Sequence, residues 1–220
     1  METNCKSLNI VAVFGIGGMM LLSLTQLVPN MLFAGYAVIF GILAFFADCI
    51  ITGRIPRQCG LSFTNLFEDM RKPGVFFWLF VPVVTAILPN LIGDWIFYGS
   101  YSASVLERAS RYLNYDNFWL LLAELFVLSL GEEIAWRGFF VGRTMQAYPF
   151  WICMVGSSFL FALGHMGSIV SPIVLFDLFF VFVDSCIFTV IYKKSGNCAV
   201  SAVSHILGNI VGLMVCFSMA

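Results

Sequence analysis

The chain has 220 residues, of which 60% are hydrophobic and 10% are charged, and its formal net charge is −1. A soluble globular domain carries about 25% charged residues, so this composition excludes an ordinary water-facing surface and indicates an integral membrane protein. The nearly neutral charge gives no basis for a nucleic-acid partner. The lipid bilayer is therefore the first partner that the sequence predicts.

Apolar stretches separated by short polar or proline-containing breaks follow one another along the whole chain. A helix needs roughly 20 such residues to cross the hydrocarbon core. Seven stretches meet this length, at about 8–28, 32–52, 74–97, 118–142, 149–169, 172–192 and 197–219. Because lipid offers the backbone no hydrogen bonds, each is expected to be a helix. We therefore predict an all-α fold, a polytopic bundle of about seven transmembrane helices that forms one integral membrane domain over residues 1–220.

Two of the connections are long enough for structure of their own. Residues 53–73 place apolar side chains at near-helical spacing beside charged ones, which favours a short helix on the membrane surface. Residues 98–117 repeat the pattern. Both are expected to be connectors that lie on the surface.

The basic residues are distributed unequally between the two faces that seven crossings would create. One face receives eight of them: Lys6, Arg54, Arg57, Arg71, Lys72, Arg143, Lys193 and Lys194. The other receives Arg108 and Arg111, while Arg137 lies within a stretch. Since cytoplasmic loops carry the excess of lysine and arginine, the N-terminus is predicted to be cytoplasmic and the C-terminus outside. The expected location is the cell membrane, with multiple passes.

Two adjacent carboxylates and an arginine interrupt the fourth stretch, at Glu132, Glu133 and Arg137. Each charge near a bilayer centre costs about 2.5–3.5 kcal/mol on insertion scales, so such residues are expected to be paired and functional. Glu133 and Arg137 are four residues apart with the acid first, the favourable order for a helical ion pair. Glu132 is rotated from Glu133 by about 100°. One carboxylate can thus pair with Arg137 while the other meets a different neighbour.

The only two histidines of the chain, His165 and His205, also fall within predicted spans. Phe161 lies four residues before His165, and Asn209 lies four residues after His205. Because residues four apart share a helix face, Phe161 is expected to pack beside the His165 ring, and Asn209 to face the same cavity as His205. Any one of these residues alone would suit a structural contact, but together they point to a functional site on three spans.

Three motifs in order, each on its own span, are Glu-Glu-x-x-x-Arg, Phe-x-x-x-His and His-x-x-x-Asn. This pattern resembles the CPBP family of intramembrane proteases, which comprises CAAX prenyl proteases of the Ras-converting type and relatives linked to bacteriocin processing and self-immunity. The resemblance covers the C-terminal half, residues 118–219. It implies proteolysis within the membrane by a water molecule that a glutamate activates.

The residue chemistry allows roles to be distributed over this set. Peptide hydrolysis needs a base for water, a donor for the oxyanion and an acid for the leaving amine. The candidate catalytic residues are Glu132, Glu133, His165, His205 and Asn209, and Arg137 and Phe161 are candidate structural or substrate-orienting residues. Glu132 is the expected base, and His165 would position or polarise the water. His205 and Asn209 would supply the oxyanion donors, while Glu133 and Arg137 would hold the framework or orient substrate.

The sequence leaves open whether a metal takes part. Glu132, His165 and His205 could bind zinc with one open position. The helical His-Glu-x-x-His signature is absent, and the seven cysteines form no Cys-x-x-Cys pair. The family resemblance permits a metal-free mechanism with the same residues, which we favour.

The expected substrate is a membrane-proximal or lipidated peptide, such as a prenylated C-terminal peptide or a bacteriocin leader. Two alternatives remain, a proton-coupled transporter and a non-catalytic protein of bacteriocin self-immunity or scaffolding. No inverted repeat favours the transporter. Asp177 and Asp184, seven residues apart in the sixth stretch, could line the cavity or pair with Arg137, and a structural role is expected for them.

Overall fold

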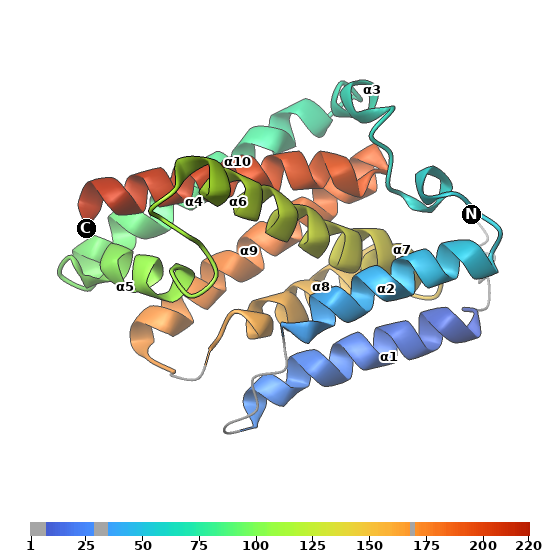
Figure 1. The fold of residues 1–220 in the computed structure, drawn as a ribbon, viewed down its shortest axis with the longest axis horizontal. Coiled ribbons are helices and arrows are strands. Elements are labelled where there is room, and N and C mark those ends of the chain that lie inside the picture. Colours follow the sequence, from blue (N-terminus) through green and yellow to red (C-terminus); the bar gives the residue numbers. More distant parts are fainter. Residues whose placement is uncertain (1–7, 29–34, 168–169) are drawn as a thin grey trace.

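A computed structural model describes residues 8–28, 35–167 and 170–220, and every regular element in these ranges is helical (Figure 1). The predicted all-α fold is confirmed, since each of the seven predicted stretches contains a helix over its described residues. Lys6 and the ends of two stretches, at 32–34 and 168–169, lie outside these ranges. The helices are α1 (Ile10–Leu24), α2 (Tyr36–Ile51), α3 (Leu66–Met70), α4 (Val75–Ile96), α5 (Ser100–Ala109), α6 (Phe118–Glu133), α7 (Gly142–Thr144), α8 (Phe150–Gly164), α9 (Pro172–Ser195) and α10 (Cys198–Met219).

Within the described ranges, four helices are long and apolar enough to cross a membrane. They are α4, α9, α10 and the segment Ile10–Leu27, in which the 3-10 helix η1 (Thr25–Leu27) extends α1. The apolar helices α2 and α8 are shorter, and α6 continues directly into the π-helix η3 (Ile134–Val141) and α7. By length and composition the chain is a multi-pass membrane protein, while the number of crossings stays a prediction.

The outer surface of the bundle carries many large apolar side chains. Phe14 of α1, Phe77 and Trp95 of α4, and Trp151 of α8 are all exposed. A water-soluble protein exposes such residues singly rather than along whole helices, whereas lipid solvates them readily. The exterior therefore agrees with the membrane environment predicted from composition.

Polar side chains at the breaks define where several helices begin. Asn9 accepts a hydrogen bond from the Ala12 amide at the start of α1, and Asn117 accepts two from the first turn of α6. Ser171 caps α9, and Asn197 caps α10. A side-chain oxygen at this position satisfies an amide that has no partner within the helix. Several of the polar residues between the apolar stretches are thus helix caps.

The core surrounds η3, in the middle of the molecule. The helix α2 packs on α1 on one side and on η3 on the other, and α10 packs on α4, α6 and α9 (Figure 1). Phe45, Trp136, Phe139 and Phe161, from three different elements, are buried together in the larger hydrophobic cluster. This packing holds the end of α6 against α10, which brings the first and third sequence motifs together.

Helices occupy both connections that were predicted to have structure of their own. Residues 53–73 contain the 3-10 helix η2 (Pro56–Cys59) and α3, and residues 98–117 contain α5. Asn197 ties the first connection to the start of α10 through hydrogen bonds with Ser62 and Asp69. Because α5 buries Tyr101 and Ser102 against the bundle, it is integrated more closely than a connector lying on the surface.

Candidate active site

The two adjacent glutamates of the first motif lie where α6 changes into the π-helix η3. All eight residues of η3 are buried. A π-helical segment has i→i+5 hydrogen bonds and a wider turn than an α-helix, and such segments are frequent at functional sites. The hydrophobic pattern predicted a helix through this region but not the change of helix type.

Glu133 and Arg137 form a buried ion pair of 2.8 Å, as their spacing predicted. Their side chains are 0% and 1% exposed, so neither charge reaches solvent. Arg137 Nη2 also donates to the carbonyl oxygen of Ser185 at 2.8 Å and to its hydroxyl at 2.7 Å. The guanidinium carbon lies 4.9 Å from the Phe161 ring centroid and 5.3 Å from that of Phe188, distances typical of cation–π contacts. Both groups are therefore held rigidly.

His205 of α10 contacts both glutamates. Its Nδ1 lies 3.0 Å from Glu133 Oε1, and its Nε2 lies 3.7 Å from Glu132 Oε2. The short contact with a carboxylate assigns a proton to Nδ1, which donates to Glu133. The imidazole stacks on Phe188, with ring centroids 4.4 Å apart and an interplanar angle of 21°. The ring is thus fixed in position, in orientation and in the tautomer that it adopts when neutral.

The two carboxylates consequently differ in their surroundings. Glu133 Oε1 receives both Arg137 and His205, while its Oε2 is buried without a hydrogen-bond partner among the described residues. The Glu132 side chain is 20% exposed, and its nearest basic group is His205. Two acids whose surroundings differ in this way can take different catalytic roles.

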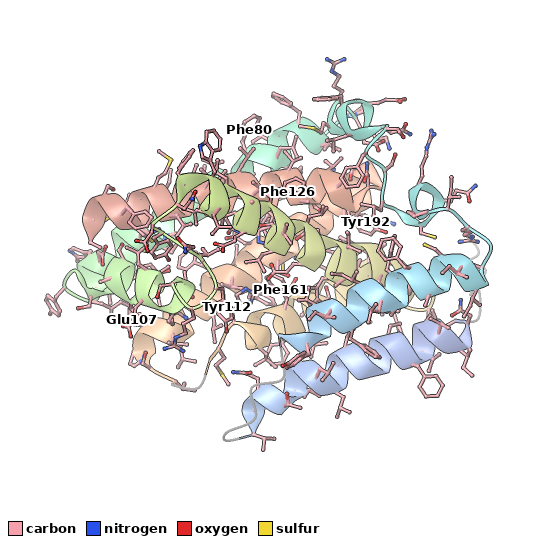
Figure 2. All side chains as sticks on the ribbon, in the orientation of Figure 1. Phe80, Glu107, Tyr112, Phe126, Phe161 and Tyr192 are labelled. Atoms are coloured by element: carbon pink, nitrogen blue, oxygen red, sulfur yellow. The ribbon has the colours of Figure 1, made fainter. Side chains whose placement is uncertain are left out.

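His165 follows the last residue of α8 and is exposed. Its Nδ1 lies 3.0 Å from the carbonyl oxygen of Phe161, so Nδ1 donates and Nε2 is left as an acceptor. The Phe161 ring centroid, near the middle of Figure 2, lies 4.7 Å from that of His165 and 6.3 Å from that of His205. In the ranges that the structure covers, no hydrogen bond or ion pair joins His165 to Glu132 or His205.

Asn209 lies one turn beyond His205 on α10, and its amide donates to the Ser129 hydroxyl of α6 at 3.0 Å. Ser129, Ser185 and Phe188 belong to no motif, and the sequence reasoning missed all three. Ser129 lies four residues before Glu133 and hence on the same helix face, a spacing that would have indicated it. Ser185 and Phe188 give no comparable signal, because their partners lie on other helices.

The two acids of α9 have separate partners, and neither pairs with Arg137. Asp177 accepts a hydrogen bond from the Tyr101 hydroxyl at 2.8 Å and forms an ion pair with Arg108 at 2.6 Å. Burial raises the pKa of Tyr101, so this phenol stays protonated and donates. Asp184 accepts a hydrogen bond from the Thr85 hydroxyl of α4. Pairing with Arg137 fails because that guanidinium already binds Glu133 and Ser185.

The residues considered for zinc do not form a ligand set. Among the residues that the structure describes, no three His, Cys, Asp or Glu side chains are grouped so that they could hold a metal ion. Glu132 and His205 approach each other, but His165 does not join them. A catalytic zinc site needs three protein ligands around one point, and this arrangement does not provide it.

Comparison with protein families gives one match relevant to this site. The model of the Rce1-like type II CAAX prenyl endopeptidases matches residues 114–211, a range that contains all three motifs. No curated protein and no solved structure gave a significant match. The match leaves out α1, α2 and α4, and it begins just before α6. Residues 114–211 therefore constitute a domain of the Rce1-like type II CAAX prenyl endopeptidase family, as the resemblance of the three motifs predicted.

Proposed function

We propose that this protein is an intramembrane endopeptidase that hydrolyses a peptide bond in a membrane-proximal or lipidated peptide, of the CAAX type that the family name indicates. The observation that carries the proposal is the unequal use of the two glutamates. Glu133 is fully buried and bound to Arg137 and His205, whereas Glu132 is partly accessible beside the His205 ring. A base for water must be accessible and must have no permanent counter-charge, and Glu132 meets both conditions.

The first step in this mechanism is removal of a proton from water by Glu132 as the water attacks the scissile carbonyl. His165 would orient that water through Nε2, because its Nδ1 is committed to the Phe161 carbonyl. The oxygen of the attacked carbonyl then becomes an oxyanion and needs hydrogen-bond donors. No serine or cysteine is required as a nucleophile, because the water itself forms the new bond.

Two donors for the oxyanion lie on α10. Asn209 uses one amide hydrogen on Ser129 and has the second available. The two ring nitrogens of His205 face the two carboxylates, and Nε2 would donate to the oxyanion when it carries a proton. Glu133 and Arg137 would act as the scaffold that orients His205. Collapse of the intermediate expels the amine, which takes the proton that Glu132 received.

The setting of the site in the membrane is part of the proposal. Seven crossings with a cytoplasmic N-terminus and an external C-terminus would agree with the distribution of basic residues. The whole chain, residues 1–220, would form one domain, with α1, α2 and α4 supporting the matched part. Neither the family description nor the side-chain geometry supports a metalloprotease mechanism or a role in bacteriocin immunity. We therefore propose a metal-free reaction.

The proposal is tested by hydrolysis of quenched peptides, including farnesylated C-terminal peptides, by protein purified in detergent. Glu132→Gln is expected to lower kcat by about 100- to 10,000-fold, the usual contribution of a general base. Glu124→Gln is the matched control, because Glu124 lies on the same helix and accepts only the exposed Asn114 amide. Chelator treatment is expected to leave activity unchanged. Wild-type rates in Glu132→Gln would refute the assignment of the base.

A further inference from the structure

A third carboxylate of the membrane interior, Asp184 of α9, has no basic partner. Its hydrogen-bond partner is the Thr85 hydroxyl of α4, and no Lys, Arg or His among the described residues lies within ion-pair distance of it. Other carboxylates of the bundle are paired: Asp48 with Arg143, Asp69 with Lys72, and Asp177 with Arg108. A charged residue inside a membrane is a functional candidate. Among the described residues, Asp94 and Glu124 also lack a basic partner, but each accepts a backbone amide from a neighbouring segment, whereas Asp184 accepts the Thr85 hydroxyl.

Asp184 adjoins the candidate active site rather than a separate region. The next residue, Ser185, binds the Arg137 guanidinium, and Phe188, one turn further on, stacks on His205. Asp184 is also close enough to interact electrostatically with both His205 and Arg137. The helix α9 packs against α4, α8 and α10 (Figure 1), and the second and third motifs lie at α8 and on α10.

The charges of this region do not balance. Glu132, Glu133 and Asp184 are three carboxylates, and among the residues that the structure describes Arg137 is the one permanent cation that interacts with them. Protonation of His205 would still leave an excess of negative charge. In addition, Glu133 Oε2 is buried and has no hydrogen-bond partner within the described part of the chain. An apolar interior stabilises a cation strongly beside such a group, because water does not screen the attraction.

We propose that Asp184, oriented by Thr85, determines substrate specificity by binding a cationic side chain of the peptide, a lysine or an arginine close to the scissile bond. The inference rests on the proposed peptidase function and deepens it. Thr85 holds one carboxylate oxygen, which leaves the second to accept from an ammonium or guanidinium group. The substrate would thereby provide the counter-charge that the protein does not supply.

The test compares quenched peptides that carry lysine or methionine at one position, scanned across both sides of the cleaved bond, and a glutamate peptide is added for Asp184→Lys. Wild-type protein is expected to prefer lysine at one position by about tenfold or more in kcat/KM, as a charge-assisted hydrogen bond would provide. Asp184→Asn is expected to abolish this preference through a higher KM for the lysine peptide, while the methionine peptide changes by less than about threefold. Asp184→Lys is expected to shift the preference toward glutamate.

Three controls keep the outcomes distinct. Thr85→Val is expected to weaken the lysine preference while leaving the carboxylate in place, and Asp177→Asn, an acid of the same helix with its own arginine, is expected to retain it. Binding of labelled peptides to Glu132→Gln protein reports selectivity without hydrolysis. An equal loss for both peptides in Asp184→Asn, or a wild type without charge preference in cleavage and in binding, would overturn the inference. Charge-selective binding without any cleavage would instead contradict the proposed peptidase.

Discussion

The side chain of Asn197 joins three parts of the chain, and replacing it with alanine tests that junction. Its amide nitrogen donates to the Ser62 carbonyl oxygen at 2.7 Å and to Asp69 Oδ2 at 2.9 Å. Its oxygen accepts from the Ser62 and Ala199 amides, each at 3.0 Å. The residue is 1% exposed, so water cannot replace these bonds. Asn197→Ala removes all four at once.

The expected loss of stability in Asn197→Ala is the sum of two contributions. Loss of a helix cap costs about 1 kcal/mol, and leaving buried polar groups unsatisfied costs about 1–3 kcal/mol. Asp69 keeps its contact with Lys72, so the larger part comes from the Ser62 peptide groups. We therefore expect Asn197→Ala to lower the free energy of unfolding by about 2–4 kcal/mol. At roughly 2–4 °C per kcal/mol for a chain of this size, Tm falls by several degrees.

Thermal unfolding in detergent measures this effect against Asn117→Ala. Asn117 also caps a helix with two hydrogen bonds, but it is exposed, and its loss is expected to cost about 1 kcal/mol. Asn197→Asp should be at least as destabilising as Asn197→Ala, because it places a second carboxylate beside Asp69. Equal Tm values for Asn197→Ala and Asn117→Ala would refute the reasoning that the junction, rather than the cap alone, stabilises the fold.

Two further changes concern buried charge and backbone strain. Arg137→Met is expected to lower the free energy of unfolding by about 3–5 kcal/mol, since it leaves Glu133 buried without its cation. Adding Glu133→Gln to this variant should recover part of the lost stability in the same assay. If the double variant instead loses the sum of the two single losses, the result would contradict the pairing. Gly60→Ala should destabilise more than Gly196→Ala, because both glycines have positive φ but only at Gly60 would a Cβ meet Tyr192, 2.8 Å from its hydroxyl oxygen. Comparable Tm values for the two alanine variants would show that the contact is unimportant.

Hydropathy and polar breaks were sufficient to predict that each of the seven apolar stretches contains a helix. Asn197 and Ser171 stand at breaks in the sequence and cap helices in the structure. The π-helix after Glu133 could not be predicted, because α- and π-helical segments bury the same kinds of residue and differ in hydrogen bonding. The burial of α5 was missed as well, since Tyr101 is amphipathic and suits a surface or an interior.

Spacing predicted contacts within a helix but not between helices. The pair Glu133–Arg137 and the packing of Phe161 beside His165 follow from four-residue separations. The binding of Arg137 by Ser185 and the stacking of Phe188 on His205 depend on how α9 lies against its neighbours, which no single segment encodes. For the same reason, the sequence could not predict which histidine would approach Glu132.

The π-helical turns after Glu133 also determine the directions in which side chains point along the continuous helical segment formed by α6, η3 and α7. An i→i+5 segment rotates less per residue than an α-helix, so the side chains beyond it point in directions that an uninterrupted α6 would not give them. On the near side, Glu133 faces α10; on the far side, Arg143 reaches Asp48 of α2, which Asn9 also binds. The π-helix thus allows one continuous helical segment to place Glu133 against α10, which lies largely within the family domain, and Arg143 against α2, which lies outside it. Removing a single residue from this turn would change the alignment of both.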